Sequence, residues 1–345
     1  MKLDGLAIVL VAVALVAATA LLLAFLWDRT GVVLRSTVVA GCALALLVAA
    51  ALQLNRMTEA YPSWSALAGT KADLPGEPPD PQPSSPVHPV ALAQTSRIEQ
   101  VTVAGPASGV SLPMYVYLPA GYDQAKIARY PVIEALHGFP GSPHTWIRRL
   151  RIQTYLDAEI NAGRMAPTVV LLPYQTTKQL LDTECTDLTR GPKSETYLTV
   201  DVPAYARAHF RVRTDRAGWG LIGYSAGAYC AANLVLKHPD KYAAAASLSG
   251  EGVPGIKVGD GSEKTTNNDD WRLTHLPPPA VSLYLAWAAD DSTSRRESLR
   301  LAGLARPPLE VTTAVVARGG HSDAAWQAME PPAFDWLSAH LARPL

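Results

Sequence analysis

The sequence predicts an α/β protein whose mostly parallel, eight-stranded sheet is flanked by helices and preceded by two transmembrane helices. Two long apolar segments without a charged residue lie near the start of the 345-residue chain. From about residue 96 onward, short β-rich segments alternate with helical ones, a pattern typical of α/β layers. We therefore expect a membrane region at residues 1–56, a linker at residues 57–95 and one folded domain at residues 96–345.

The charge balance and the cysteines narrow the classes of partner. Lys plus Arg and Asp plus Glu both number 30, so the formal net charge is zero at pH 7. Nucleic-acid-binding domains carry a basic surface, so we do not expect nucleic acid as a partner. Cys42, Cys185 and Cys230 show no Cys-x-x-Cys or Cys/His spacing, and we expect neither a metal nor a cofactor.

The N-terminal region predicts two membrane spans. Gly5–Trp27 holds 23 uncharged residues and Ser36–Asn55 holds 20, and about 20 apolar residues cross a bilayer as a helix. A cleaved signal peptide is the alternative for the first segment, and a buried hairpin is the alternative for the pair. Arg29 and Arg35 lie in the predicted loop between the spans, which favours a cytoplasmic loop. The folded domain would then lie outside the cell membrane.

Seven prolines between Pro75 and Pro89 predict an extended linker. Proline fixes φ and lacks an N–H, so this stretch favours polyproline II over helix or central strand. We interpret it as a stalk, with a docking site for a proline-binding module as the alternative.

The folded domain has eight candidate strands, which are Glu99–Val103, Met114–Leu118, Val132–Leu136, Thr168–Pro173, Gly218–Gly223, Ala243–Leu248, Val281–Trp287 and Glu310–Ala317. The candidate helices are Thr145–Ala162, Tyr197–Ala208, Ala226–His238, Ser294–Leu304 and Ala324–Ala342.

The stretch Gly223-Tyr224-Ser225-Ala226-Gly227 has the pattern of a nucleophile elbow. In such an elbow a strained turn between a strand and a helix exposes the serine hydroxyl, and glycines two residues away leave it room. A candidate strand precedes Ser225 and a candidate helix follows it. We predict Ser225 as the nucleophile; a serine in an ordinary glycine-rich turn is the alternative.

A nucleophilic serine needs a base and an acid that orients the base. With this elbow the order along the chain is serine, acid, histidine. Four histidines follow Ser225, namely His238, His275, His321 and His340. Only His321 comes directly after a candidate strand, in a loop that also holds Gly319 and Gly320. We predict His321 as the base, against a structural loop histidine.

Two adjacent carboxylates, Asp290 and Asp291, follow the strand before that one. The acid of this loop usually lies three residues after a small residue, which matches Ala288 and Asp291. We predict Asp291 as the orienting acid and keep Asp290 as the alternate; the neighbour of the acid could cap the following helix.

An ester carbonyl under attack needs two backbone N–H donors for its developing negative charge. One comes from the residue after the nucleophile, here Ala226, and one from the loop after an early strand. In the stretch His137–Gly141, Pro140 has no N–H, so Phe139 is the candidate donor. A tight turn without a catalytic role is the alternative.

Three stretches together resemble the esterase D and antigen 85 type of α/β-hydrolase, over about Val101 to Leu345. They are Pro131–Ser142 (PVIEALHGFPGS), the GYSAG elbow with HPDKY after its helix, and Gly319–Trp326. The resemblance implies the α/β-hydrolase fold and acyl-ester chemistry without a cofactor. It also implies a triad of Ser225, His321 and Asp291, with Phe139 and Ala226 as oxyanion donors.

Two positions depart from the mycolyl-transferring members of this branch. Those members carry an aspartate where this chain has His137 and an alanine in place of Gly227. The departure favours a general esterase over trehalose mycolyl transfer.

Cys185 and Cys230 both fall in the domain expected outside the membrane, where an oxidising compartment permits a disulfide. Two small buried thiols are the alternative. Cys42 lies in an apolar segment and is expected to act as a small apolar residue.

The sequence therefore predicts a membrane-anchored serine hydrolase that cleaves a small-molecule or lipid ester. An acyltransferase that delivers the acyl group to a sugar or lipid alcohol is the first alternative. A non-catalytic, anchored binding protein of the same fold is the second.

Overall fold

The computed structural model describes residues 6–58, 95–178 and 180–345. The chain divides into two compact units, Met1–Gln82 and Pro83–Leu345. The predicted proline-rich linker lies, apart from its two ends, outside the described residues.

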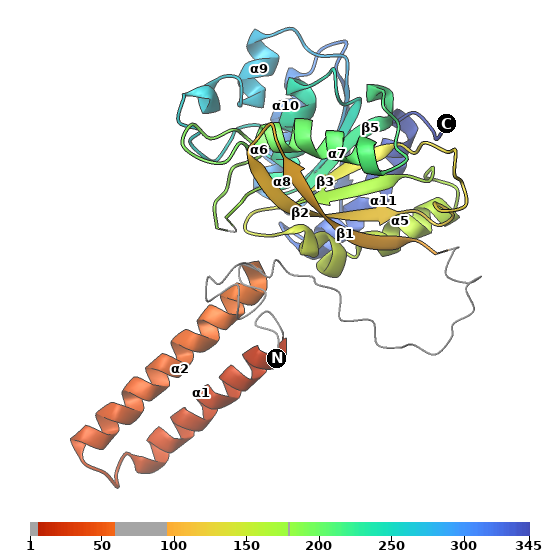
Figure 1. Cartoon of the computed structure of the whole chain (residues 1–345). Helices are drawn as coiled ribbons and strands as arrows, with labels where there is room; N and C mark the ends of the chain where they lie inside the picture. The colour runs from red at the N-terminus through yellow and green to blue at the C-terminus, as the bar shows by residue number, and fades with distance from the viewer. Residues whose placement is uncertain (1–5, 59–94, 179) are drawn as a thin grey trace. The chain divides into compact units, whose positions relative to one another are not determined.

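The first unit contains two helices, α1 (Leu6–Leu26) and α2 (Val32–Thr58), which lie side by side (Figure 1). Ile8 and Val9 of α1 pack with Leu52 of α2. Both helices are long and apolar enough to cross a membrane, although a signal sequence near the N-terminus meets the same criterion. The helix α2 begins before the predicted start, so Arg35 belongs to the helix and not to the connecting loop.

The second unit is built on one sheet of eight strands in the order β1-β2-β4-β3-β5-β6-β7-β8. The strands are β1 (Arg97–Gly105), β2 (Val110–Leu118), β3 (Val132–Leu136), β4 (Val169–Pro173), β5 (Trp219–Tyr224), β6 (Ala244–Leu248), β7 (Ser282–Ala288) and β8 (Glu310–Val316). The pairings β1–β2 and β2–β4 are antiparallel, and all other pairings are parallel. The predicted mostly parallel sheet is thereby confirmed.

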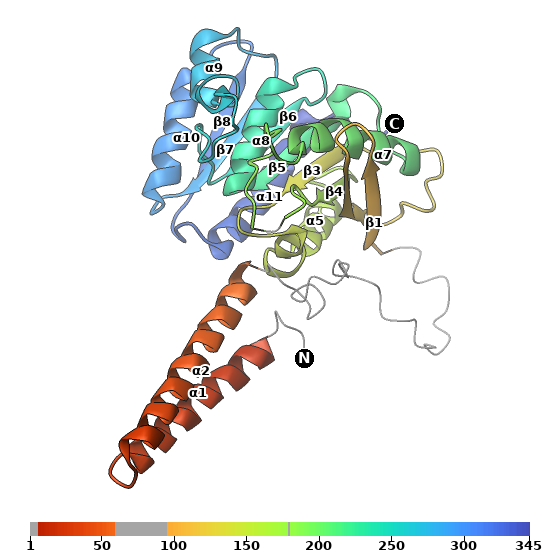
Figure 2. The same cartoon turned by 60° about the vertical axis from the view of Figure 1, so that its left-hand side comes forward.

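Helices cover both faces of this sheet (Figures 1 and 2). Parallel strands are joined by right-handed crossovers, so the direction in which the chain moves along the sheet decides the face of each helix. The helices α5 and α11 pack together on one face, and α7, α8 and α10 lie on the other. Their bounds, with those of two short helices, are α5 (Ile152–Asn161), α6 (Ser194–Thr196), α7 (Val202–His209), α8 (Ala226–Lys237), α9 (Asp269–His275), α10 (Ser292–Leu304) and α11 (Asp323–His340).

Three helical segments differ from the expectation. The predicted helix 145–162 is interrupted, because Arg151 adopts a left-handed conformation with φ 59° between a π-helical turn, Thr145–Arg149, and α5. A second π-helical turn, Tyr197–Asp201, precedes α7. The short helix α9 was not expected; the side chain of Asn268 caps it by accepting a hydrogen bond from the N–H of Trp271.

The central strands place the candidate site. Every residue of β3 and β5 is buried, as expected for strands covered on both faces. Because β3, β5, β6, β7 and β8 run parallel, the loops that follow them all leave from the same edge of the sheet. Ligands of open α/β sheets bind at this edge.

Candidate active site

Ser225 lies between the end of β5 and the start of α8, with φ 55° and ψ −125°. A residue other than glycine rarely adopts a positive φ, and such strain is typical of functional sites. A Cβ atom at Gly223 would lie 1.9 Å from the carbonyl oxygen of Gly227, and one at Gly227 would lie 2.3 Å from that of Leu136. Both glycines are required because backbone atoms occupy the space that a side chain would fill.

The structure brings the predicted base and acid to Ser225. The Oγ of Ser225 lies 2.8 Å from Nε2 of His321, and Nδ1 of His321 lies 2.9 Å from Oδ2 of Asp291. An ionised carboxylate accepts only, so Nδ1 carries the proton and Nε2 keeps a lone pair for the serine hydroxyl. The side chain of His321 is 45% exposed, so the serine and imidazole are open to a substrate from solvent.

The two adjacent aspartates have different contacts. Asp291 is buried and, besides His321, accepts a hydrogen bond from the N–H of Ser294 at the start of α10. Burial alone would raise the pKa of Asp291, but the hydrogen bonds from His321 and Ser294 outweigh it and lower the pKa. Asp291 is therefore ionised at neutral pH. It serves both as the partner of His321 and as the cap of α10.

Asp290 faces the loop backbone. Its carboxylate accepts hydrogen bonds from the N–H groups of Gly319 and Gly320, at 3.2 and 2.8 Å, and these bonds lower its pKa. Asp290 thus holds the loop that carries His321 rather than the imidazole itself.

The predicted oxyanion donors come from the start of α8, at Ala226, and from the loop after β3, at Phe139. Ala226 is the first residue of α8, so its N–H has no partner within the helix. Phe139 follows Gly138, at which a Cβ atom would lie 3.1 Å from the Cβ of Ser225 and 2.7 Å from the ring of Tyr224. Because Gly138 has no side chain, the backbone of this loop approaches Ser225 closely.

His137, at the position of the family departure, is buried and neutral. Burial lowers its pKa to about 4, although a hydrogen bond from its Nδ1 to the carbonyl oxygen of Gly138 partly opposes this. At neutral pH this residue therefore supplies no charge to the site, unlike an aspartate.

A cavity of about 240 Å³ opens beside Ser225 and His321. Its other lining residues include Glu184, Tyr229, Ser249 and Glu251. Sequence reasoning missed these residues. The sequence held two local signals. Glu184 precedes Cys185, a cysteine already singled out, and Ser249 directly follows the predicted strand Ala243–Leu248.

Cys185 and Cys230 are joined by a disulfide that links the loop after β4 to α8 across 45 positions of sequence. Cys42 is a free cysteine of α2. Within the described part of the chain, no group of three His, Cys, Asp or Glu side chains could hold a metal ion.

A sheet of this order, with a half-buried serine on a strained elbow beside a histidine and an aspartate, is typical of the α/β-hydrolase fold. The chain matches the family described as "Putative esterase" over residues 106–334, and it belongs to this family. The predicted resemblance to this family is confirmed.

Curated relatives are distant. The chain is 25% identical over 241 residues to an uncharacterized protein of Corynebacterium glutamicum, covering 65% of this chain and 56% of that protein. It is 24% identical over 156 residues to an endo-1,4-beta-xylanase/feruloyl esterase of Xylanibacter ruminicola, covering 44% of this chain. The match spans 21% of the length of that relative.

Solved structures share the fold. A ferulic acid esterase matches with a TM-score of 0.63 and 19% identity, over 72% of this chain and 100% of its own. An S-formylglutathione hydrolase from Agrobacterium tumefaciens matches with a TM-score of 0.60 and 15% identity, over 72% of this chain and 97% of its own.

Proposed function

We propose that this protein is a membrane-anchored serine esterase that forms an acyl-enzyme on Ser225, with His321 as base and Asp291 as orienting acid. The observation that carries the proposal is the continuous contact from Oγ of Ser225 through the imidazole to Asp291, at 2.8 and 2.9 Å. Positive φ at Ser225 supports the same role, because it is the conformation of a nucleophile elbow.

In the first half of the reaction, Oγ of Ser225 bonds to the ester carbonyl carbon while its proton moves to Nε2 of His321. The N–H groups of Phe139 and Ala226 stabilise the negative charge on the carbonyl oxygen. The bond to the leaving alcohol oxygen then breaks, and that oxygen takes the proton from His321.

In the second half, a water molecule gives a proton to Nε2 of His321 and bonds to the acyl carbon. The bond to Oγ of Ser225 breaks, Oγ regains a proton, and the acid is released. Throughout, the ionised Asp291 holds Nδ1 of His321 and stabilises the imidazolium.

We place the catalytic domain, residues 96–345, outside the cell membrane, with residues 1–56 as its anchor and residues 57–95 as its linker. Large apolar side chains of both N-terminal helices, such as Leu21 and Val33, are exposed, and lipid would cover them. The disulfide between Cys185 and Cys230 supports an oxidising compartment.

The proposal is tested with the full chain in detergent, by hydrolysis of a short p-nitrophenyl ester and by labelling with a fluorophosphonate. We expect turnover and labelling of the wild type and neither in Ser225→Ala. Absence of both in the wild type would instead favour the non-catalytic binding protein. An added sugar or lipid alcohol separates hydrolysis from transfer, and a new ester product would favour the acyltransferase.

A further inference from the structure

The loop after β4 places a buried carboxylate in the cavity beside the nucleophile. Glu184 is only 9% exposed, and its side chain lines the same cavity as Ser225 and His321. Glu184 and Cys185 both have positive φ, 42° and 56°, which is rare for residues other than glycine. The disulfide to Cys230 fastens this unusual backbone to α8.

Among the described residues, the charged neighbours of this carboxylate include no basic side chain. Both oxygens of Glu184 accept from the N–H of Gly255, at 2.9 and 3.0 Å. Its charged neighbours, Asp182 and Glu251, are acidic. No lysine or arginine is among the residues that line the cavity. Burial, with the repulsion from Asp182 and Glu251, raises the pKa of Glu184 to about 7, despite the hydrogen bonds from the N–H groups of Gly255 and Ile256.

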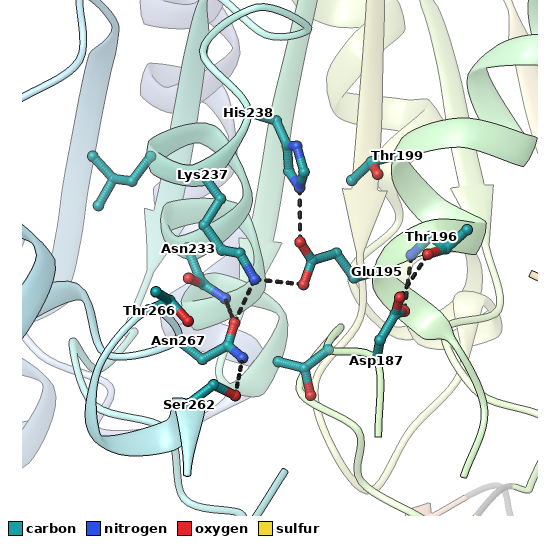
Figure 3. A network of polar contacts seen from close by, with 12 residues as sticks. Asp187, Glu195, Thr196, Thr199, Asn233, Lys237, His238, Ser262, Thr266 and Asn267 are labelled. Carbon is teal, nitrogen blue, oxygen red and sulfur yellow. Dashed lines mark hydrogen bonds and ion pairs between the residues drawn. The ribbon is translucent and has the colours of Figure 1, made fainter. Parts of the chain in front are cut away.

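Elsewhere the chain does pair a partly buried carboxylate, that of Glu195. Figure 3 shows Glu195 between Lys237 and His238, at 2.5 and 2.8 Å. Buried charges in proteins are normally paired in this way. Glu184 differs from Glu195 because it lines a cavity, which leaves room for a positive partner from outside the chain.

Ser249 provides a second, independent observation. It is 1% exposed, has a positive φ of 58°, and lines the same cavity. Within the described residues, its Oγ has no hydrogen-bond partner. A buried hydroxyl without a partner costs free energy unless something else satisfies it.

We propose that the cavity receives an organic ammonium group of the substrate, with Glu184 as its principal partner. The inference rests on the proposed esterase function and names the class of ester that it accepts. A volume of about 240 Å³ holds several water molecules' worth of space, at roughly 30 Å³ each, and is smaller than a drug-sized pocket. A small cationic head group matches this size and charge; Glu251 adds to the negative potential, and the Ser249 hydroxyl accepts from an N–H where the group has one.

The test compares esters that differ by one atom. Acetylcholine, the acetate ester of choline, and neohexyl (3,3-dimethylbutyl) acetate are isosteric, with a quaternary nitrogen in one and a carbon in the other. A second pair carries the charge on the acyl side: the ethyl ester of gamma-butyrobetaine and its neutral tert-butyl analogue. Each ratio of kcat/KM, cationic over neutral, is divided by the ratio of the hydroxide-catalysed rates, which removes intrinsic reactivity.

In at least one pair we expect the full chain to prefer the cation by about tenfold, and Glu184→Gln to abolish most of this preference. Glutamine keeps an oxygen for the N–H of Gly255 but has no charge. The matched control is Glu310→Gln at the opposite edge of the sheet, which should leave the preference unchanged. Equal rates for both members of each pair, or a preference that survives Glu184→Gln, would overturn the proposal.

Binding is measured separately from turnover, so that the two proposals fail independently. Choline should slow fluorophosphonate labelling of the wild type more than neohexanol does, and Glu184→Gln should remove the difference. Equal protection by the two alcohols would overturn the ammonium site even if the esterase is active. Labelling and hydrolysis that survive Ser225→Ala would overturn the proposed nucleophile instead.

Discussion

One carboxylate lies beside each end of α8, and the pKa values of the two shift in opposite directions. Glu184 lies by the N-terminal end, beside Ser225, and Glu195 lies by the C-terminal end, beside Lys237 and His238 (Figure 3). Burial raises the pKa of both. At Glu195 the hydrogen bond from His238 and the charge of Lys237 outweigh burial and lower the pKa, whereas at Glu184 the pKa rises to about 7.

This difference teaches that a neighbouring cation can outweigh burial in setting the pKa of a carboxylate beside this helix. Both acids belong to one segment, 182–196, but Glu184 faces the acidic Asp182 and Glu251 whereas Glu195 faces Lys237 and His238. At the C-terminal end, Lys237 and His238 of the chain itself pair with the carboxylate. The N-terminal end has a net negative charge and lies where a substrate would bind.

The largest effect should separate the two ends by activity. Ser225→Ala at the N-terminal end should lower kcat/KM for a neutral p-nitrophenyl ester by about 10³-fold or more. Lys237→Met at the other end removes a charge but touches no reacting atom, and we expect less than about a tenfold change. If Lys237→Met lost as much activity as Ser225→Ala, the two ends would not be independent.

The next effect concerns the acids at the N-terminal end. Asp291→Asn should lower kcat by about 10²- to 10⁴-fold, because His321 loses the partner that holds Nδ1 and its protonated form. Asp290→Asn removes only contacts to loop N–H groups, and we expect a loss of less than about tenfold. A larger loss in Asp290→Asn than in Asp291→Asn would reverse the two roles.

Breaking the paired end should destabilise the fold. Glu195→Gln leaves Lys237 and His238 without their carboxylate, and we expect the free energy of unfolding to fall by about 1–3 kcal/mol at pH 7. The pKa of Glu195 is lowered by folding, so its stabilisation is full above the ordinary value of 4.5 and is lost as pH falls below it. Denaturant unfolding at several pH values measures this, with Glu310→Gln as control; an unchanged stability at pH 7 would contradict the pairing.

At the other end of α8, substitution of Glu184 should change the free energy of unfolding with the opposite sign. Folding raises the pKa of Glu184 from 4.5 to about 7, so the folded protein binds the proton more tightly and wild-type stability falls as pH rises through this window. Glu184→Gln has no such loss. Its stability relative to the wild type should therefore increase between these pH values, by about 1.4 kcal/mol for each pH unit, and then level off. A difference that does not depend on pH would show that Glu184 is not the titrating group.

Much of the fold was predictable from local patterns. Each strand is a short apolar or β-branched run bounded by turn residues, and all eight predicted strands are present. The elbow was also predictable, because its two glycines and serine are adjacent in sequence. His321 and Asp291 could be placed near Ser225 because each follows a parallel strand, although their catalytic roles stay predictions.

The cavity could not be predicted in the same way. Glu184 reaches it because two residues other than glycine adopt a positive φ, a conformation that local propensity disfavours. The disulfide and the contacts of Glu195 with α8 hold this segment, and each depends on residues far apart in sequence. The left-handed Arg151, which divides the predicted helix 145–162, is a similar case of tertiary packing that overrides a local preference.

The glycine at position 227 has a consequence for how the chain can change over generations. Its missing side chain leaves α8 so close to β3 that a Cβ atom would meet two backbone oxygens, those of Leu136 and His137, at 2.3 and 2.6 Å. Backbone atoms cannot rotate away as a side chain can, so an alanine here requires the helix and the strand to separate. A lineage with alanine at this position therefore differs from this chain by the spacing of two elements. Glycine can therefore be replaced by alanine at position 227 only after other substitutions have changed the packing beneath the elbow.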